Sequence, residues 1–415
     1  MALLAIHALA QSGGSPLTLD DCVRLALAAP SSVRLARQQT EIARLGVHQA
    51  RANFLPQFSI GASYAYNSPS LYDQRNFSFL ALNGIREYSV LPQTAVELDT
   101  SGRLRAAMDR ARADREVANA NLALSERDLK HAVAASYYHV LLTRKLVDAT
   151  RANLTEARSF EDRIRLLVQG GEASQADFIK AASQTAMLDQ AQQALELEVR
   201  LANHDLASFW TADVDAPLTL TDVMEQTLPP PEPASAPMPY LRRLEFHLFD
   251  AQKLGFQADA RRARAEMLPQ ASIVFQYGFD AQRVSINDRG YASFVHLNIP
   301  VFDWFRAKSA SRQFQFQVQQ VDTTRQIAQR TFSKEYQDAL ARVQLIYAQI
   351  ATTDTQVKLS EDNLRLSRVR YEAGEGPALD VVAAQAQLVQ ARTNYYVVRA
   401  SYLTARADLE VARGQ

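Results

Sequence analysis

Apolar residues near the C-terminus, between Leu379 and Ala412, follow two heptad patterns at once. One pattern comprises Val382, Ala386, Val389, Thr393, Tyr396, Ala400, Leu403 and Ala407. The other comprises Val381, Ala384, Leu388, Ala391, Tyr395, Val398, Tyr402, Ala405, Leu409 and Ala412. Residues two positions apart lie about 200° apart around a helix, so the two apolar seams occupy nearly opposite flanks. An ordinary surface helix has one apolar stripe, whereas this pattern predicts a helix that packs against neighbours on both sides.

The polar residues of the same stretch form two further rows of different character. One row is Gln385, Arg392, Arg399, Arg406 and Arg413, and the opposite row is Asp380, Gln387, Asn394, Ser401 and Asp408. The simplest arrangement with such walls is a ring of helices, with one polar face outside and the other lining a bore. A helix sandwiched in a solvent-exposed antiparallel bundle or solenoid is the alternative for this stretch alone. We interpret the arginine row as a solvated or partner-facing surface.

Residues 17–228 predict helices that flank one β-hairpin. A short helix from Leu17 to Ala29 and a longer one from Val33 to Phe54 are followed by residues that alternate between apolar and small or polar. The further elements expected are a β-hairpin over about 57–99, a long helix over about 103–169 and a return helix over about 173–210. At 1.5 Å per residue, the long helix would measure about 100 Å.

Residues 240–415 repeat this pattern after a Pro-rich linker at 229–239. The triplet Leu-Pro-Gln at 55–57 recurs at 268–270, in both places at the end of a helix and before an alternating segment. The expected elements are a helix, a β-hairpin over about 270–302, a long helix over about 306–372 and a return helix over about 378–413. The two halves are therefore one structural unit used twice.

The alternating segments have the length of tilted β-strands that span the hydrocarbon layer of a bilayer. Residues of the apolar face that we expect to contact lipid are Ile60, Tyr64, Val96, Phe275, Tyr277 and Val295. Four strands cannot close a barrel with a useful lumen, so several chains must contribute strands to it. The alternative is a soluble α+β protein with two aromatic hairpins packed on helices, but a helix of about 100 Å leaves a short hairpin without a globular core.

The N-terminal residues predict a processed segment. MALLAIHALA has the apolar core and small-residue ending of a secretory signal, although no basic residue precedes Arg24. We interpret residues 1–16 as a signal-peptide remnant and tail, with an ordinary flexible N-terminus as the alternative. Leu19, Asp20 and Asp21 precede Cys22, which argues against a lipid-attachment cysteine. No run of eighteen apolar residues occurs, so the sequence predicts no transmembrane helix.

Composition and motifs argue against catalysis and nucleic-acid binding. Lys plus Arg and Asp plus Glu both number 45, so no bulk charge attracts nucleic acid. The seven His are scattered, none with the spacing of a metal pair on one helix face, and no phosphate-binding loop occurs. We therefore expect no enzyme activity, no metal site and no cofactor.

Several motifs in order resemble the TolC-like outer membrane efflux proteins, from Leu17 to Gly414. They are LTLDDCVRLAL, RANFLPQFSIGASY with its echo RAEMLPQASIVFQY, IPVFDWFRAKSA and RVRYEAGEGPALDVVAAQAQLVQA. The resemblance implies a mixed α/β membrane protein in the bacterial outer membrane. Its homotrimer would contribute four strands per chain to a 12-stranded β-barrel, continued by a long periplasmic α-helical barrel.

The resemblance also implies roles for residues near the Gly-rich turns. Asp380 resembles the acid of the periplasmic gate, Asp177 the acid that bonds neighbouring hairpins, and Tyr371 its partner. Helix capping and dipole stabilisation are the alternative role for both acids. Ala383 and Gly376 stand where the family has a second gate acid and an arginine, which implies a weaker latch. The turns expected to face an adaptor contain Gly170, Gly171, Gly374 and Gly376, and the row expected to face the lumen is Gln387, Asn394, Ser401 and Asp408.

The function implied is a passive exit duct for small molecules in a tripartite efflux pump, completed by a periplasmic adaptor and an inner-membrane transporter. A type I protein secretion duct of the same architecture is one alternative. A soluble, elongated coiled-coil scaffold is an alternative of a different class. The sequence does not identify the substrate, so antibiotics, metal ions and secreted proteins all stay open.

Overall fold

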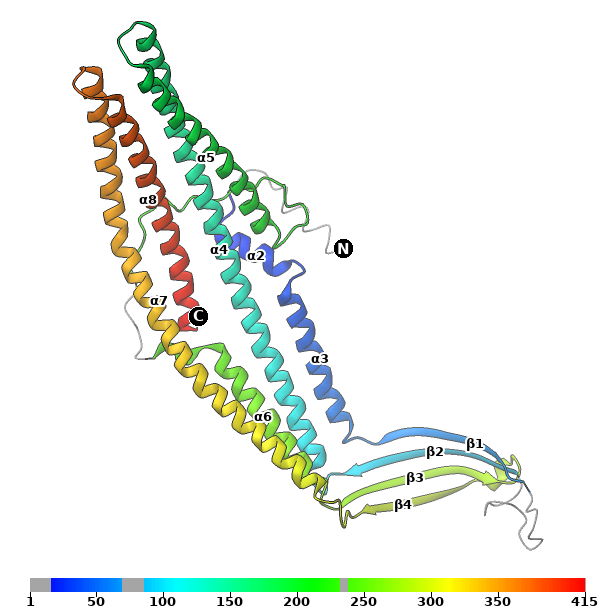
Figure 1. Ribbon diagram of the computed structural model, residues 1–415. Helices are drawn as coiled ribbons and strands as arrows, with labels where there is room; N and C mark the ends of the chain where they lie inside the picture. Colours follow the sequence, from blue (N-terminus) through cyan, green and yellow to red (C-terminus); the bar gives the residue numbers. More distant parts are fainter. Residues whose placement is uncertain (1–15, 69–85, 232–237, 415) are drawn as a thin grey trace. The chain divides into compact units, whose positions relative to one another are not determined.

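The computed structural model describes residues 16–68, 86–231 and 238–414 (Figure 1). Its helices are α2 (Leu19–Ala28), α3 (Ser32–Ala52), α4 (Arg103–Gln169), α5 (Gln175–Ala207), α6 (Leu244–Ala265), α7 (Arg306–Glu372) and α8 (Ala378–Arg413). Its strands are β1 (Gln57–Tyr66), β2 (Arg86–Leu98), β3 (Gln270–Ala281) and β4 (Gly290–Asn298), and two short 3-10 helices are η1 (Pro239–Arg242) and η2 (Ile286–Asp288). The expected signal-peptide remnant, apart from Pro16, and part of the expected linker lie outside the described residues.

The first return helix is shorter than the range expected from the sequence. Helix α5 begins only after Ser174, whose side chain accepts a hydrogen bond from the Asp177 amide and caps the helix. It ends at Ala207, because the Phe209 and Trp210 amides bond to carbonyls three residues back in tighter turns. The periodic pattern could not show these local hydrogen bonds.

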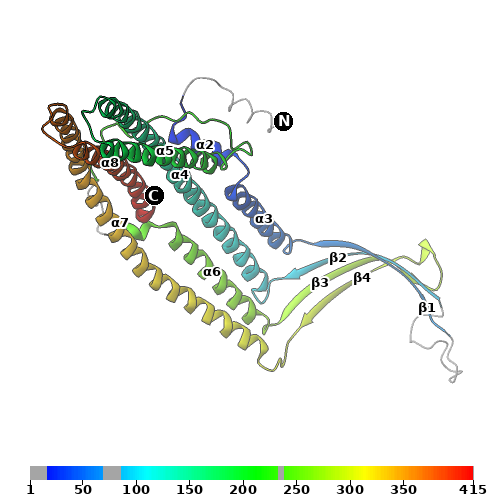
Figure 2. The ribbon, with the colours of Figure 1, turned by 45° about the horizontal axis from the view of Figure 1, so that its top comes forward.

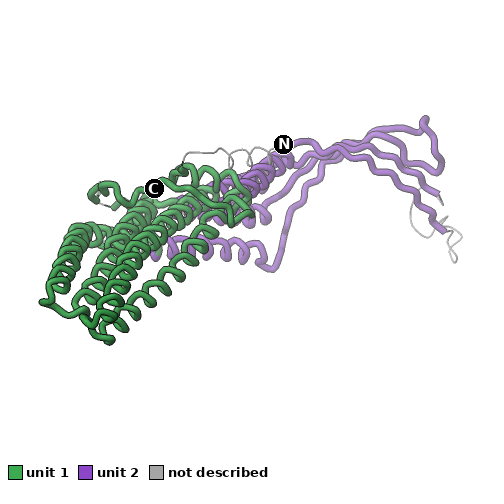
Figure 3. Tube along the Cα trace, turned by 90° about the horizontal axis from the view of Figure 1, so that it is seen from above, with its two compact units in different colours: residues 1–36, 122–244, 328–415 green, residues 37–121, 245–327 purple. Residues whose placement is uncertain are grey.

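The chain divides into two compact units (Figure 3). The first unit comprises residues 1–36, 122–244 and 328–415, and the second comprises residues 37–121 and 245–327. Each long helix therefore contributes its first part to the second unit and its last part to the first. Among the described helices, none combines sufficient length with the apolar composition needed to cross a membrane.

The second unit contains one antiparallel sheet in the order β1-β2-β3-β4 (Figure 2). Pairing of β2 with β3 joins the hairpins of the two repeats. Within the described residues, β1 and β4 each pair on one side only. The register places all the residues expected to contact lipid on one face of the sheet, namely Ile60, Tyr64, Val96, Phe275, Tyr277 and Val295.

The opposite face of the sheet carries a ladder of polar side chains. Gln93 Nε2 donates to Ser59 Oγ at 3.0 Å, and Gln276 Nε2 donates to Gln93 Oε1 at 2.9 Å. These three residues come from β1, β2 and β3, so one polar row crosses three strands. The two faces of the sheet thus differ in chemistry, as the period-2 alternation requires.

The helices of the second unit follow the same order as its strands. Arg110 of α4 forms an ion pair with Asp259 of α6, and Lys253 of α6 pairs with Asp322 of α7 at 2.7 Å. Helix α3 contacts α4, since the Thr40 hydroxyl donates to the Ala118 carbonyl. The order α3-α4-α6-α7 makes a single layer of helices.

Two helical hairpins, α4 with α5 and α7 with α8, dominate the first unit (Figure 1). On α8, most of the seam that begins at Val381 is buried, including Leu388, Tyr402 and Leu409. Much of the other seam, which begins at Val382, stays partly or fully exposed in the single chain, and Ala386 is an exposed member. One flank of α8 is therefore covered within this chain and the other is covered only in part.

A further core lies around α2, where Cys22 is fully buried as a free thiol. Burial raises the pKa of this thiol to about 12. The Tyr137 hydroxyl of α4 donates to the Thr221 carbonyl at 2.7 Å, and Leu17 bridges to Leu220. The segment after α5 is thus fixed to the helices by backbone and side-chain bonds.

Gly278 allows β2 and β3 to approach each other beside a proline. The pairing of β2 with β3 is interrupted at Leu91 and Pro92 without a change of register, and Pro92 has no amide hydrogen to donate. At Gly278 φ is +149°, and a Cβ there would lie 2.0 Å from the Val90 carbonyl oxygen. Only glycine fits this backbone without moving β2.

We predict that Gly278→Ala destabilises the protein by about 1–3 kcal/mol, the usual cost of forcing an extra methyl group into a packed site. Thermal unfolding in detergent, followed by circular dichroism, measures the effect. Gly61→Ala is the matched control, because its Cβ would meet nothing closer than the Leu91 carbonyl oxygen at 3.8 Å. Equal melting temperatures for the two variants would contradict the prediction.

Candidate functional site

The two turns that connect the long helices with the return helices have the same backbone design. Gly171 and Gly374 adopt left-handed conformations, with φ of +78° and +73°. The Glu172 amide bonds to the Leu167 carbonyl at 2.8 Å, and the Glu375 amide bonds to the Arg370 carbonyl at 2.9 Å. This is the Schellman arrangement, in which a glycine ends a helix and satisfies its last carbonyls.

The other two glycines expected in the adaptor-facing turns have ordinary backbone conformations. Gly170 and Gly376 flank the left-handed residues and have no positive φ. A Cβ at Gly376 would lie 3.5 Å from Arg370 Cβ and 3.8 Å from Asp380 Oδ2. The turn geometry therefore depends on Gly171 and Gly374, whereas a Cβ at Gly170 or Gly376 would make only ordinary van der Waals contacts.

Asp177 and Asp380 occupy equivalent places in the first turns of α5 and α8. The Ser174 hydroxyl donates to Asp177 Oδ2 at 2.7 Å and accepts from the Asp177 amide at 3.2 Å. Helix α8 has Pro377 at its N-cap and no side-chain cap, and the Asp380 amide bonds to the Pro377 carbonyl. The helix dipole favours a negative charge in the first turn, and both acids supply one. For Asp177, the hydrogen bonds with the N-cap residue Ser174 also support the capping role considered from the sequence.

Tyr371 lies at the end of α7, against α4. Its ring meets the Phe160 ring edge-on, with centroids 5.4 Å apart. Burial and the nearby Asp177 carboxylate raise the pKa of Tyr371. The pairing of Tyr371 with Asp177 stays a prediction.

Two ion pairs beside Tyr371 join α4 to α7. Arg163 Nη1 lies 2.6 Å from Glu372 Oε1, and Arg368 Nη2 lies 3.1 Å from Glu156 Oε2. We call these four residues the α4–α7 clasp. The clasp borders a cavity of about 230 Å³ that is also lined by Tyr371. Each pair is partly exposed, so each contributes about 0–1 kcal/mol.

The sequence pattern alone does not identify the clasp. Glu156 and Arg163 are seven residues apart, which places them on one face of α4. Arg368 and Glu372 are four residues apart, which places them on one face of α7. These spacings were a usable signal. Pairing them across helices required knowing that α4 and α7 lie side by side.

The arginine row of α8 is not uniformly solvated, so that expectation is wrong for Arg399. Arg399 is 7% exposed, and its guanidinium donates to the carbonyls of Met224 and Gln226. It also lies over the Tyr395 ring at 5.2 Å. The segment after α5 covers α8 here, and a buried guanidinium needs such acceptors.

Arg392, one row position nearer the tip, connects three helices. It donates to Asn153 Oδ1 of α4 and to Glu361 Oε1 of α7, both at 2.9 Å. Gln385, the first member of the row, is buried as well. This face of α8 therefore makes contacts inside the chain at these positions.

The row expected to face the lumen has mixed surroundings in the single chain. Gln387 is exposed and accepts from Asn363 Nδ2 at 3.1 Å, while Asn394 accepts from Gln390 Nε2 at 2.8 Å. Ser401 is half-buried, and Asp408 Oδ1 lies 2.6 Å from His131 Nε2 of α4. The lumen-facing role of this row stays a prediction.

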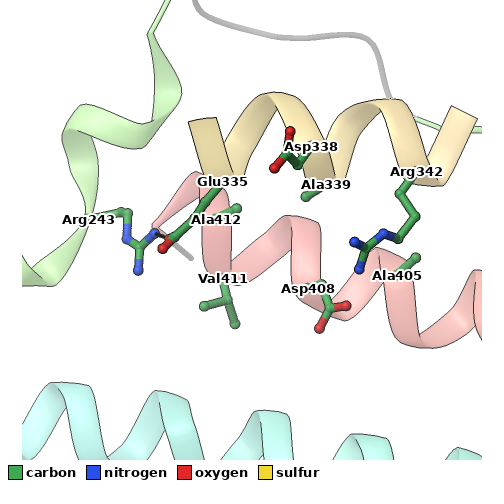
Figure 4. A pocket seen from close by; sticks show the side chains of 9 residues that line it. All are labelled: Arg243, Glu335, Asp338, Ala339, Arg342, Ala405, Asp408, Val411 and Ala412. Atoms are coloured by element: carbon green, nitrogen blue, oxygen red, sulfur yellow. Dashed lines mark hydrogen bonds and ion pairs between the residues drawn. The ribbon is translucent and has the colours of Figure 1, made fainter. Parts of the chain in front are cut away.

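A second cavity, of about 280 Å³, lies between α7 and α8 (Figure 4). Its charged lining residues are Arg243, Glu335, Asp338, Arg342 and Asp408. Arg243 is buried, pairs with Glu335 at 2.5 Å and lies over the Phe332 ring at 3.7 Å. These contacts fix η1 to α7. Across the described part of the chain, no three His, Cys, Asp or Glu side chains gather as a metal site would require.

Comparison with family models identifies one family. The sequence matches the model of the family described as outer membrane efflux protein over residues 22–211 and 251–415. No curated protein matches this sequence.

Solved structures share the fold at low sequence identity. A membrane protein from Pseudomonas aeruginosa is 20% identical with a TM-score of 0.86, and the match covers 95% of this chain and 92% of that one. The outer membrane protein VceC from Vibrio cholerae is 17% identical with a TM-score of 0.83, covering 95% and 96%. The open state of the Neisseria gonorrhoeae MtrE outer membrane channel is 20% identical with a TM-score of 0.80, covering 95% and 88%.

We predict that Arg399→Leu destabilises the first unit by about 1–3 kcal/mol, because the Met224 and Gln226 carbonyls lose their donors. Thermal unfolding reports the loss, and limited proteolysis should cut the segment after α5 faster. Arg406→Leu is the control, since Arg406 lies on the same row and is half-buried. If both variants unfold like the wild type, the buried guanidinium does not hold this segment.

Proposed function

The chain belongs to the outer membrane efflux protein family, and from this premise we propose that it forms the exit duct of a tripartite efflux pump. The protein is located in the bacterial outer membrane, and small molecules leave passively through it. A periplasmic adaptor and an inner-membrane transporter complete the pump. The alternative of a soluble coiled-coil scaffold is wrong, because the family is one of outer membrane proteins.

One observation supports the proposal above others: the second unit is a single layer with two open sides. The edge strands β1 and β4 each pair on one side within the described residues. Apolar side chains are exposed on both edge helices, Ile42 and Leu45 on α3 and Phe316 and Ile327 on α7. Open edges and exposed apolar residues favour pairing with further copies. In our proposal three copies close a 12-stranded barrel, continued by a helical barrel in the periplasm.

The chemistry of the sheet supports an orientation for its two faces. Ile60 and Val295 on the apolar face are 73% and 75% exposed, and the aromatic side chains Tyr64, Phe275 and Tyr277 share that face. The ladder of Ser59, Gln93 and Gln276 lies on the other face. We assign the apolar face to lipid and the polar ladder to a water-filled lumen.

A charge on each face tests this orientation. We predict that Tyr277→Arg impairs insertion into lipid vesicles, because a cation on the lipid face costs about 2–4 kcal/mol near mid-bilayer. Gln276→Arg, one residue away on the polar face, should insert like the wild type. The fraction of protein that floats with vesicles in a density gradient gives the comparison. Equal insertion of the two variants would count against the assignment.

We propose that the tip of the first unit is the gate. Asp380, Asp177 and Tyr371 lie in or beside the turns, and the turns with Gly171 and Gly374 form the surface that an adaptor grips. The sequence lacks the second gate acid at Ala383 and the arginine at Gly376. In this chain the α4–α7 clasp supplies the link between hairpins, so opening requires α7 to move away from α4.

Planar-bilayer recording tests both the duct and its gate. The wild type should conduct ions, and the double variant Arg163→Gln with Arg368→Gln should raise the open fraction about two- to tenfold, since it removes two weak ion pairs. Arg165→Gln is the matched control, because Arg165 forms its ion pairs with Glu161 and Asp162 of its own helix and none with α7 in the described part of the chain.

The outcomes separate the two proposals. Absence of conductance in the wild type and in every variant would overturn the duct. An equal open fraction in the double variant and the Arg165→Gln control would overturn the clasp and leave the duct intact.

A further inference from the structure

An exposed aromatic cluster lies at the turn between β4 and α7. Phe302, Trp304 and Phe305 are 63%, 84% and 64% exposed. The rings of Phe302 and Trp304 meet edge-on with centroids 4.9 Å apart, and those of Phe302 and Phe305 are 6.0 Å apart. The Phe302 ring therefore contacts both other rings, while most of the surface of all three residues is exposed.

The backbone of this turn is strained at two bulky residues whose side chains are mostly exposed and so are not held by packing within the chain. Trp304 and Phe305 have φ of 56° and 60°, a conformation that bulky residues avoid. Strain of this kind persists where a functional role compensates for it.

The first repeat makes the equivalent turn without aromatic residues. There Asp99 accepts from the Leu104 amide at 2.8 Å, as Asp303 accepts from the Ala307 amide at 2.9 Å. Between Asp99 and the helix stand Thr100, Ser101 and Gly102, and Gly102 takes the positive φ of +78°. The turn can thus be built with glycine, so the aromatic residues of the second repeat serve another purpose.

Charge and neighbouring surface indicate what covers the cluster. Arg306, Lys308 and Arg312 follow it, and no acid occurs between Arg306 and Val321. Asp303 is occupied by helix capping. On the other side of the cluster, exposed Ile299 and Val301 continue the apolar face of β4. Aromatic rings between an apolar surface and a cationic one are typical of the boundary between lipid tails and headgroups.

The charge of the segment after the cluster favours lipid as its partner. Phosphate groups of lipids complement the positive charges of Arg306, Lys308 and Arg312.

We propose that residues 302–305, with Lys308 and Arg312, anchor the protein to phospholipid headgroups at the membrane boundary nearest α7. This inference rests on the proposed outer membrane duct and adds a lipid-binding site to it. The rings enter the boundary between tails and headgroups, and the two cations bind phosphate. Lipid contact offsets the strain at Trp304 and Phe305.

Tryptophan fluorescence tests the anchor, because the chain has two tryptophans, Trp210 and Trp304. Trp210→Phe leaves Trp304 as the only emitter in full-length protein reconstituted into phosphatidylglycerol and phosphatidylethanolamine vesicles. Lipids brominated near the headgroup should quench this emission more than lipids brominated near the tail end. Trp304→Phe, which keeps Trp210, should show no quenching. The difference between wild type and Trp304→Phe gives the same reading if Trp210→Phe does not fold.

Two results would overturn the anchor. Quenching of Trp304 by iodide but not by brominated lipid would mean that the cluster faces water. Resistance to both quenchers would mean that protein covers it. Bilayer conductance of the same preparation is read separately, so loss of the anchor with normal conductance leaves the proposed duct standing.

Replacement of the strained residues gives an independent measurement. Trp304→Gly with Phe305→Gly places glycine at both residues with positive φ and relieves the backbone. The anchor predicts slower insertion into vesicles with an unchanged assembly in detergent. The double variant Thr100→Gly with Ser101→Gly is the control and should insert normally. Normal insertion of the Trp304 and Phe305 variant would contradict the proposal.

Discussion

Hydrogen bonding between β2 and β3 is the contact on which the second unit depends, because it joins two hairpins far apart in the sequence into one sheet. A shift of this register by one residue would move every side chain of the second hairpin to the opposite face. The apolar face and the polar ladder would then be mixed across the sheet. The register is kept even though Pro92 removes a donor and Gly278 must take a conformation open only to glycine. Position 278, where β3 lies against β2, thus accepts only glycine without a shift of the backbone.

Sequence periodicity was sufficient for the elements of the fold and for the faces of the sheet. The strands alternate over most of their length, and the long helices lack Gly and Pro, so local pattern and global fold agree there. The family resemblance is confirmed by the family match. The pattern also indicated the buried flank of α8, because a heptad seam depends only on residues of one helix.

The contacts that sequence could not give are those between distant segments. Arg399 was assigned to an outer surface because its row is polar, but the segment carrying Met224 and Gln226 covers it. The clasp could not be predicted for a similar reason, since Arg163 and Glu372 are more than two hundred residues apart in the sequence. The spacing of charged residues within α4 or within α7 does not show which residues of the other helix they pair with. Capping by Ser174 was easier to predict from the sequence, because Ser174 and Asp177 are only three residues apart. The sequence therefore indicated interactions between residues that are close in the chain, and it left open the contacts between distant segments.

The two return helices begin differently although they descend from one repeated unit. Ser174 closes the start of α5, whereas Pro377 leaves the first amides of α8 without a side-chain acceptor. Helix starts that lack a side-chain cap fray more readily. In the proposed ring of three copies, firm and compliant turns would alternate around the tip, so the tip would have threefold mechanical symmetry although six similar hairpins would build it. A partner that docks there would contact two kinds of turn, the firm turn before α5 and the compliant turn before α8. If the partner rotated by one hairpin, each of its contacts would meet a turn of the other kind.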